Sequence, residues 1–238
     1  MSVFVIADLH LATDNSQKSM EIFGKRWSNY IEKIKKNWIA VVGENDTVIL
    51  PGDISWGLTT EDARNDLLWI ERLPGNKIIM KGNHDFWWAT VSKLTAFFET
   101  NGIKTIKLLN NNAIEVEDYI VAGSRGWFTD KSMQNAEETV DYAKIVNRET
   151  IRLKMSLDAA TLLKKESDKE IVVFLHFPPV WSDFCCEPII ELLKKYGIGR
   201  CYFGHIHGNY SLPETFEYEG IKFHMISADF IDFLPRIV

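Results

Sequence analysis

The sequence has few cysteines, and their arrangement excludes two common kinds of site. The 238 residues include three, Cys185, Cys186 and Cys201. Their number is odd, two of them are adjacent, and none has the CxxC spacing. A disulfide framework and a thiolate metal site are therefore not expected. This cysteine usage is typical of a reducing compartment.

Targeting signals and long apolar runs are also missing. The first eight residues lack a basic stretch and reach a carboxylate at Asp8, which is unlike a signal peptide. No apolar run reaches the roughly 20 residues that a membrane-spanning helix needs. The sequence therefore predicts a cytoplasmic protein that does not interact with membranes.

The chain has no excess of positive charge. It has 27 lysines and arginines against 33 acidic residues, which gives a net charge of −6. Broad attraction to duplex nucleic acid or to an anionic membrane is therefore not expected, although a locally positive metal site could bind a phosphate. Hydrophobic residues make up 46%, and no repeat or linker interrupts the chain. We expect one globular domain over residues 1–238.

Short apolar runs alternate with stretches of helical periodicity. The runs are rich in Val, Ile and Phe and have little polar alternation, which predicts strands that are buried on both faces. They cover residues 3–7, 47–50, 77–80, 171–175 and 201–203, with further strands near 113–123 and 221–227. Apolar residues at spacings of three and four predict helices over 23–38, 61–73, 91–99, 137–165 and 187–196. This alternation predicts the α/β class.

Five motifs with metal-binding or acid–base side chains directly follow these predicted strands. They are Asp8-Leu9-His10, Gly52-Asp53, Gly82-Asn83-His84-Asp85, His176 and Gly204-His205-Ile206-His207. Histidine is a common metal ligand and a general acid near neutral pH. In α/β sheets, ligands bind beyond the carboxyl ends of the strands, so one edge would gather all five motifs. The pattern predicts a metal-dependent active site.

The order of the motifs resembles that of the calcineurin-like metallophosphoesterase superfamily, in particular its small bacterial-type phosphohydrolases. The motifs extend from Asp8 to His207, so the resemblance covers most of the chain. It implies a four-layer α/β/β/α sandwich, in which two mixed sheets are flanked by helices and two metal ions lie at the edge.

The resemblance also implies which residues bind the metals. One ion would be held by Asp8, His10 and His207, the other by Asn83, His176 and His205, and Asp53 would bridge both. These nitrogen and oxygen donors suit two divalent ions from among Mn, Fe, Zn, Co and Ni. A hydroxide that bridges the ions would attack the phosphorus in line, while the ions bind the phosphoryl oxygens.

The third motif is expected to supply the acid. By the resemblance, His84 protonates the leaving oxygen or stabilises the transition state, and Asp85 orients it. An imidazolium next to a carboxylate is a suitable acid near neutral pH. The second motif departs from many relatives, because Gly52-Asp53-Ile54-Ser55-Trp56 lacks the second acid or Asn of Gly-Asp-x-x-Asp/Asn. The metal-ligand position is kept, and the subfamily is left open.

Two further features could determine the substrate. Arg125 lies between glycines after the strand 119–122, where it could bind a phosphate oxygen or belong to a solvated turn. Several aromatic residues follow the motifs closely and could stack a planar group or pack the loops. They are Trp56, Phe86, Trp87, Trp88, Trp127, Phe128 and Trp181.

We therefore predict a metal-dependent phosphoesterase that acts on a phosphorylated small molecule, including nucleotide-like compounds. The sequence does not distinguish a phosphomonoester substrate from a phosphodiester substrate. One alternative is a metal-dependent nuclease that acts on short oligonucleotides. The other is a non-catalytic protein-binding scaffold, which would be expected to lack ligands or the acid, whereas all of them are present here.

Overall fold

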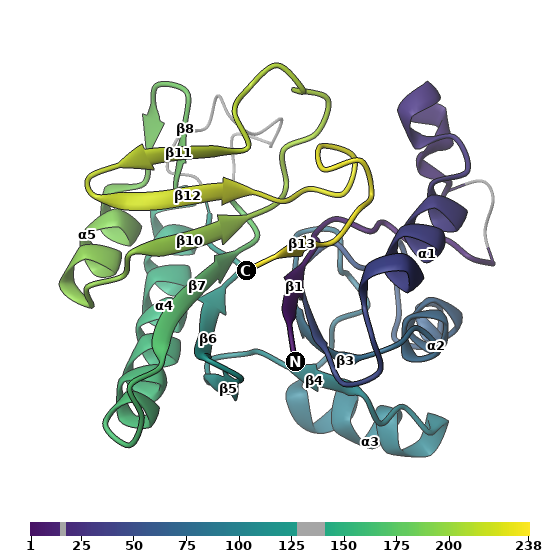
Figure 1. Cartoon of the computed structure of the whole chain (residues 1–238), viewed down its shortest axis with the longest axis horizontal. Coiled ribbons are helices and arrows are strands. Elements are labelled where there is room, and N and C mark those ends of the chain that lie inside the picture. Colours follow the sequence, from purple (N-terminus) through teal and green to yellow (C-terminus); the bar gives the residue numbers. More distant parts are fainter. Residues whose placement is uncertain (15–17, 128–140) are drawn as a thin grey trace.

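Two large sheets face each other and are covered by helices on their outer sides (Figure 1). A computed structural model describes residues 1–14, 18–127 and 141–238. The predicted α/β sandwich with two mixed sheets is confirmed. Among the helices in these ranges, none is both long and apolar enough to cross a membrane.

The first sheet is built mainly from the N-terminal half of the chain. Its order is β13-β1-β2-β3-β4. Strands β1 (Val3–Val5), β2 (Thr47–Pro51), β3 (Asn76–Met80) and β4 (Ile106–Leu108) are parallel. Strand β13 (Arg236–Ile237) pairs antiparallel with β1 at the edge.

The second sheet has the order β11-β12-β10-β7-β6-β5. Its four central strands are parallel, and the two edge strands β11 and β5 are antiparallel. In sheet order, the bounds are Thr215–Tyr218, Ile221–Met225, Arg200–Phe203, Glu170–Leu175, Tyr119–Ser124 and Ile114–Val116. A separate short hairpin is formed by β8 (Val180–Trp181) and β9 (Phe184–Cys185).

The helices form the two outer layers. Helices α1 (Tyr30–Val41), α2 (Arg64–Glu71) and α3 (Val91–Asn101) cover the first sheet, and α4 (Tyr142–Lys164) and α5 (Glu187–Lys195) cover the second (Figure 1). Three separate clusters of buried apolar side chains fill the three interfaces between layers. Each buried aliphatic or aromatic side chain contributes about 1.5–3 kcal/mol, so all three interfaces stabilise the relative position of the layers.

The helix predicted over residues 23–38 begins later than expected. The chain first forms two short 3₁₀ turns, η2 (Met20–Phe23) and η3 (Lys25–Trp27), and α1 starts only at Tyr30. Gly24 (φ 119°) and Asn29 (φ 53°) interrupt the helical backbone. Of the apolar residues in these turns, Met20 and Trp27 are buried, whereas Phe23 is exposed. The predicted helix 137–165 is observed as α4, and residues 137–140 of that prediction lie outside the described ranges.

The segment that follows β12 joins the two sheets near the carboxyl end of β1. Ala7 pairs with Ser227 in a parallel bridge. The Ala7 amide donates to the Ile226 carbonyl at 2.9 Å, and the Ala228 amide donates to the Ala7 carbonyl at 2.9 Å. The carboxyl ends of the parallel strands of both sheets are therefore fixed at one shared edge.

A buried lysine on β3 gives the first sheet a pH-dependent stability. Lys77 is fully buried, and its Nζ donates to the Leu73 carbonyl and to the Thr105 hydroxyl. Burial lowers the pKa of Lys77 from 10.5 to about 8. The folded state therefore binds fewer protons than the unfolded state between these two values, and stability rises with pH in that window.

We expect Lys77→Met to remove this dependence. Relative to Lys77→Met, the wild-type protein should gain stability between pH 7 and pH 10, by at most about 3 kcal/mol. Thermal unfolding of both proteins at the two pH values measures the difference. The exposed Lys36→Met serves as control and should show no such change. A pH-independent difference for Lys77→Met would contradict the prediction.

Candidate metal centre

The predicted ligands all follow parallel strands at the shared edge of the two sheets. Asp8 and His10 come after β1, Asp53 after β2 and Asn83 after β3. From the second sheet, His176 follows β7, and both His205 and His207 follow β10. The convergence of the motifs that strand order predicts is therefore observed.

The backbone at four of these residues has the left-handed conformation. The φ angles are 60° at Asp8, 46° at His10, 51° at Asp53 and 70° at His205. Such angles cost on the order of 1–3 kcal/mol each in residues other than glycine, and they persist only where surrounding contacts impose them. Here the Asp8 amide donates to the Gly52 carbonyl at 3.1 Å, and the His10 amide donates to the Asp53 carbonyl at 2.9 Å.

Two glycines leave room for the carboxylates. A Cβ atom at Gly82 would collide with the carboxylate of Asp53, and one at Gly204 would collide with that of Asp8. Steric hindrance therefore explains why glycine precedes Asn83 and His205 in the motifs. Gly82 lets the loop after β3 approach the loop after β2 in the same sheet, and Gly204 lets the loop after β10 approach the end of β1 in the other sheet.

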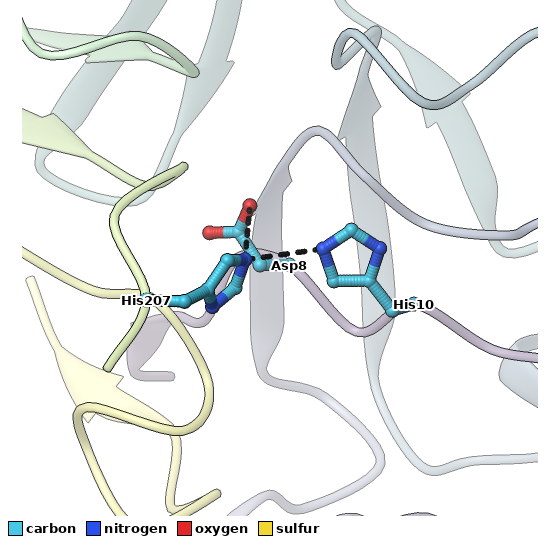
Figure 2. Close-up of side chains that lie close together, drawn as sticks. All are labelled: Asp8, His10 and His207. Atoms are coloured by element: carbon cyan, nitrogen blue, oxygen red, sulfur yellow. Dashed lines mark hydrogen bonds and ion pairs between the residues drawn. The ribbon is translucent and has the colours of Figure 1, made fainter. Parts of the chain in front are cut away.

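The first group of candidate ligands contains Asp8, His10 and His207 (Figure 2). His10 Nε2 lies 3.2 Å from His207 Nε2. His207 Nε2 also lies 3.9 Å from Asp8 Oδ1. One donor atom from each residue lies within 4.8 Å of the others, which is close enough for a single ion to be bound by all three.

The second group contains Asp53, His176 and His205, with donor atoms again within 4.8 Å of one another. Asn83 joins this group, because its Oδ1 lies 2.6 Å from His176 Nε2. His176 Nδ1 lies 3.2 Å from the carbonyl oxygen of Pro51, which can only accept a hydrogen bond. The proton is therefore expected on Nδ1, and the lone pair of Nε2 faces the group.

Asp53 lies between the two groups. Its Oδ2 is 3.6 Å from His10 Nε2 and 3.5 Å from His176 Nε2. Its Oδ1 accepts a hydrogen bond from the His84 amide at 2.8 Å. One carboxylate oxygen thus faces nitrogens of both groups, as a bridging ligand would.

The unpaired atoms of the centre fit divalent cations. Asp8 Oδ1 and Asp53 Oδ2 are buried and accept no hydrogen bond. Burial raises the pKa of Asp8 to about 7, and burial together with Asp85 and Asp8 raises that of Asp53. Burial lowers the pKa of His205 to about 3 and that of His176 well below its usual range. Neutral imidazoles and buried oxygen acceptors without donors are what metal ions require.

A known protein family matches most of the chain. The family described as calcineurin-like phosphoesterase matches residues 1–209. The chain belongs to this family. It is therefore a metal-dependent phosphoesterase, as the order of its motifs predicts, and the residues that the structure describes include two candidate metal-binding groups.

Individual relatives are distant. The Gene 66 protein of Mycobacterium phage L5 is 37% identical over 83 residues, which cover 33% of this chain and 37% of that protein. The phosphopantetheinyl hydrolase of Mycobacterium tuberculosis has a TM-score of 0.51 at 15% identity, over 100% of this chain and 95% of the other. The protein TT1561 of Thermus thermophilus has a TM-score of 0.59 at 10% identity, over 99% and 97%. These two structures share the fold.

In this phosphoesterase the predicted acid lies beside the first group. The His84 ring centroid is 5.6 Å from that of His10 and 4.6 Å from that of Trp56. Burial and the nearby His207 lower the pKa of His84. The ring is partly exposed, so it is accessible from the surface of the phosphoesterase.

Asp85 contacts the loop that carries His84 and leaves the ring itself free. Its carboxylate accepts from the amides of Ile54, Ser55 and Gly82 at 2.9, 3.2 and 2.7 Å. It also accepts from Trp87 Nε1 at 2.9 Å. Within the described ranges, no hydrogen bond joins Asp85 to the His84 imidazole. Any orienting effect of Asp85 on His84 therefore passes through the loop backbone.

Asp229, which none of the five motifs contains, holds His207. Its Oδ1 lies 2.7 Å from His207 Nδ1, and its Oδ2 accepts from the Tyr210 hydroxyl at 2.9 Å. Burial opposes protonation of His207, but the hydrogen bond to Asp229 and the negative charges of Asp8 and Asp229 together outweigh it and raise the pKa of His207. Asp229 lies outside the motifs, and its only sequence signal is a carboxylate within an apolar stretch.

A buried acid from α2 lies near the position at which the second motif lacks its carboxylate. Asp66 Oδ2 accepts from the Ser55 hydroxyl at 2.5 Å. Asp66 Oδ1 accepts from the Thr13 amide at 2.9 Å. This carboxylate connects the loops that follow β1 and β2, and these loops carry the first three predicted ligands.

The predicted aromatic rim is only partly observed. A cavity of about 430 Å³ adjoins the first group, and Trp56, Trp27 and His84 line it. Trp56 stacks on His10 with 4.9 Å between ring centroids. Trp87 is instead buried in the core of the first sheet. The other aromatic residues predicted for the rim do not line this cavity, and Phe128 lies outside the described residues.

Arg125 lies outside both ligand groups but is connected to the second. Its carbonyl oxygen accepts from the amides of His176 at 3.2 Å and of Phe177 at 2.9 Å. Its guanidinium pairs with Glu149 at 3.1 Å and lies 4.5 Å from the Trp127 ring centroid. A role for Arg125 in phosphate binding stays a prediction.

We expect Asp229→Asn to weaken metal binding by about 10- to 100-fold, because residues that orient metal-binding histidines commonly have effects of this size. The rise in Tm on addition of Mn²⁺ measures the affinity of each protein for the metal. For the wild-type protein, an excess of 100 times Kd contributes about 2.7 kcal/mol per site. The matched control is Asp232→Asn, since Asp232 is an exposed acid in the same loop. Equal Mn²⁺ responses in both variants would exclude this role.

Proposed function

We propose that this phosphoesterase is a two-metal hydrolase of small phosphorylated molecules. The observation that supports it best is the position of Asp53 Oδ2, 3.6 Å from His10 Nε2 in one group and 3.5 Å from His176 Nε2 in the other. Asp8, His10 and His207 would hold one ion. Asn83, His176 and His205 would hold the second, and Asp53 would be shared.

The role of each residue follows from the chemistry of its side chain. When bound, two divalent ions supply an activated water and neutralise charge on the phosphoryl oxygens. The buried carboxylates and neutral imidazoles position these charges at the edge of the sheets. The His84 amide fixes Asp53, while the partly exposed His84 ring is placed to give a proton to the leaving-group oxygen.

The surroundings of the centre favour a small substrate with a planar or apolar part. The cavity beside His84 is lined by Trp27 and Trp56, which could stack a nucleobase or another ring. The net charge of −6 weighs against duplex nucleic acid. A cytoplasmic location is also proposed, supported by the free cysteines.

A substrate panel tests the proposal. Protein loaded with Mn²⁺ should hydrolyse p-nitrophenyl phosphate, bis-p-nitrophenyl phosphate or nucleotides, and the relative kcat/KM values would separate monoesterase from diesterase activity. Short oligonucleotides in the same panel test the nuclease alternative. Asp53→Asn should lower kcat by several orders of magnitude, because it removes the shared ligand. If protein with both metal sites filled hydrolyses none of these compounds, the proposal is wrong.

His84→Ala should retain the metals and lose most of the turnover. A missing general acid typically costs about 10²- to 10⁴-fold, and the loss should be greater for a leaving group of high pKa. Comparison of phenyl phosphate with p-nitrophenyl phosphate measures this dependence. His224→Gln, which alters a histidine outside the five motifs, is the control. A normal kcat of His84→Ala with phenyl phosphate would exclude the acid role.

A further inference from the structure

A second cavity, of about 590 Å³, lies at the carboxyl end of β3, the strand that Asn83 follows. It lies between the carboxyl ends of β3 and β6 and is bordered by residues of α3 and α4. Four of its lining side chains are cationic, and one is a carboxylate. The cations are Lys81, Lys93, Arg125 and Arg152, and the carboxylate is Glu149.

The cavity has more positive charges than the single carboxylate of Glu149 can neutralise. Glu149 is fully buried, and its Oε1 alone lies 3.1 Å from Arg125 Nη2 and 2.9 Å from Arg152 Nη1. Arg148 Nε, at 3.5 Å, is a third cationic neighbour of the same oxygen. Lys81 and Lys93 form no ion pair with any residue in the described parts of the chain. A chain with a net charge of −6 thus concentrates positive charge in one place.

The start of α3 adds to this potential. Thr90 caps the helix, with its Oγ1 accepting from the Lys93 amide at 3.4 Å. Thr90, Val91 and Lys93 all line the cavity. The free amides of a helix N-terminus carry partial positive charge and favour anions.

The cavity is connected to the second ligand group through the backbone. Lys81 lies two residues before Asn83, at the end of β3. The Arg125 carbonyl accepts from the His176 amide at 3.2 Å, which fixes the end of β6 against the end of β7. The cavity of about 430 Å³ that Trp27 and Trp56 line is called the aromatic cavity. His10 and His207 of the first group also line it. The aromatic cavity is therefore lined by ligands of the first group, whereas the cationic cavity is lined by residues that neighbour the second group in the chain or through backbone hydrogen bonds.

We propose that the cationic cavity binds a second phosphate-type group of the substrate. One phosphoryl group is cleaved at the metals, and a second anionic group is held by Lys81, Lys93, Arg125 and Arg152. Guanidinium and ammonium groups form charge-assisted hydrogen bonds with phosphate oxygens. The substrate class is thus a compound that carries two phosphate-type groups. This inference rests on the proposed two-metal hydrolysis for the position of the first group.

Calorimetric titration of the Mn²⁺-loaded protein tests the cavity without turnover. The probes are ethylphosphonate and a series of alkane-1,n-diphosphonates with two to six methylene groups. In the wild-type protein, the best diphosphonate should bind at least about tenfold more tightly than ethylphosphonate, since one additional charge-assisted contact contributes enough for this ratio. In Lys93→Gln/Arg152→Gln, the ratio of the two Kd values should fall to near one.

The matched control is Arg72→Gln/Lys222→Gln, which removes the same two charges from exposed positions that do not line the cavity. Its Kd ratio should equal that of the wild type. Thermal unfolding checks that both variants fold, and the single variant Lys93→Gln, which breaks no ion pair, should show a partial loss.

The inference is wrong if no diphosphonate binds better than ethylphosphonate. It is also wrong if the advantage survives in Lys93→Gln/Arg152→Gln, since the metals alone would then bind both ends and the cations would serve only to neutralise Glu149. Because calorimetry needs no hydrolysis, a protein that binds diphosphonates through these residues but hydrolyses nothing would contradict the proposed function and leave the cavity assignment standing.

Discussion

The structure depends on a group of buried carboxylates and imidazoles held at the edge of two apolar sheets. Asp8, Asp53 and His176 are almost completely buried, and Asp8 Oδ1 and Asp53 Oδ2 have no hydrogen-bond donor. Isolated buried charges cost several kcal/mol each. The apolar interfaces between the four layers offset this cost and leave the oxygens oriented for cations. The left-handed backbone at four of the ligands is a further cost, which the same packing imposes.

The joint between the sheets explains why these groups meet. The bridge between Ala7 and Ser227 ties the end of β1 to the segment after β12. The same segment carries Asp229 to His207. One short stretch of chain therefore both closes the sandwich and orients a predicted metal ligand, so the stability of the edge and the geometry of the centre are coupled.

Several features of the structure differ from what the sequence predicts. The helix predicted over residues 23–38 starts only at Tyr30, because Gly24 and Asn29 interrupt the helical backbone, and apolar spacing alone does not reveal such a break. Asp85, which is expected to orient His84, accepts hydrogen bonds from backbone amides of the surrounding loops, and a motif does not reveal such partners. Asp66 and Asp229 reach the centre from distant segments, and nothing in the local sequence indicates their partners.

The sequence alone determined the fold class, the family and the set of candidate ligands. It could do so because strand-end motifs depend on local features: an apolar run, a glycine where a Cβ would collide, and a donor side chain directly afterwards. The tertiary structure alone supplied the distances among these donors, with Asp53 Oδ2 almost equally far from His10 Nε2 and His176 Nε2. It also decided that Asp229 holds His207, that an aromatic cavity is lined by His10 and His207, and that a cationic cavity forms at the ends of β3 and β6. These relations join residues far apart in the chain, and only the packing of one sheet on the other fixes such distances.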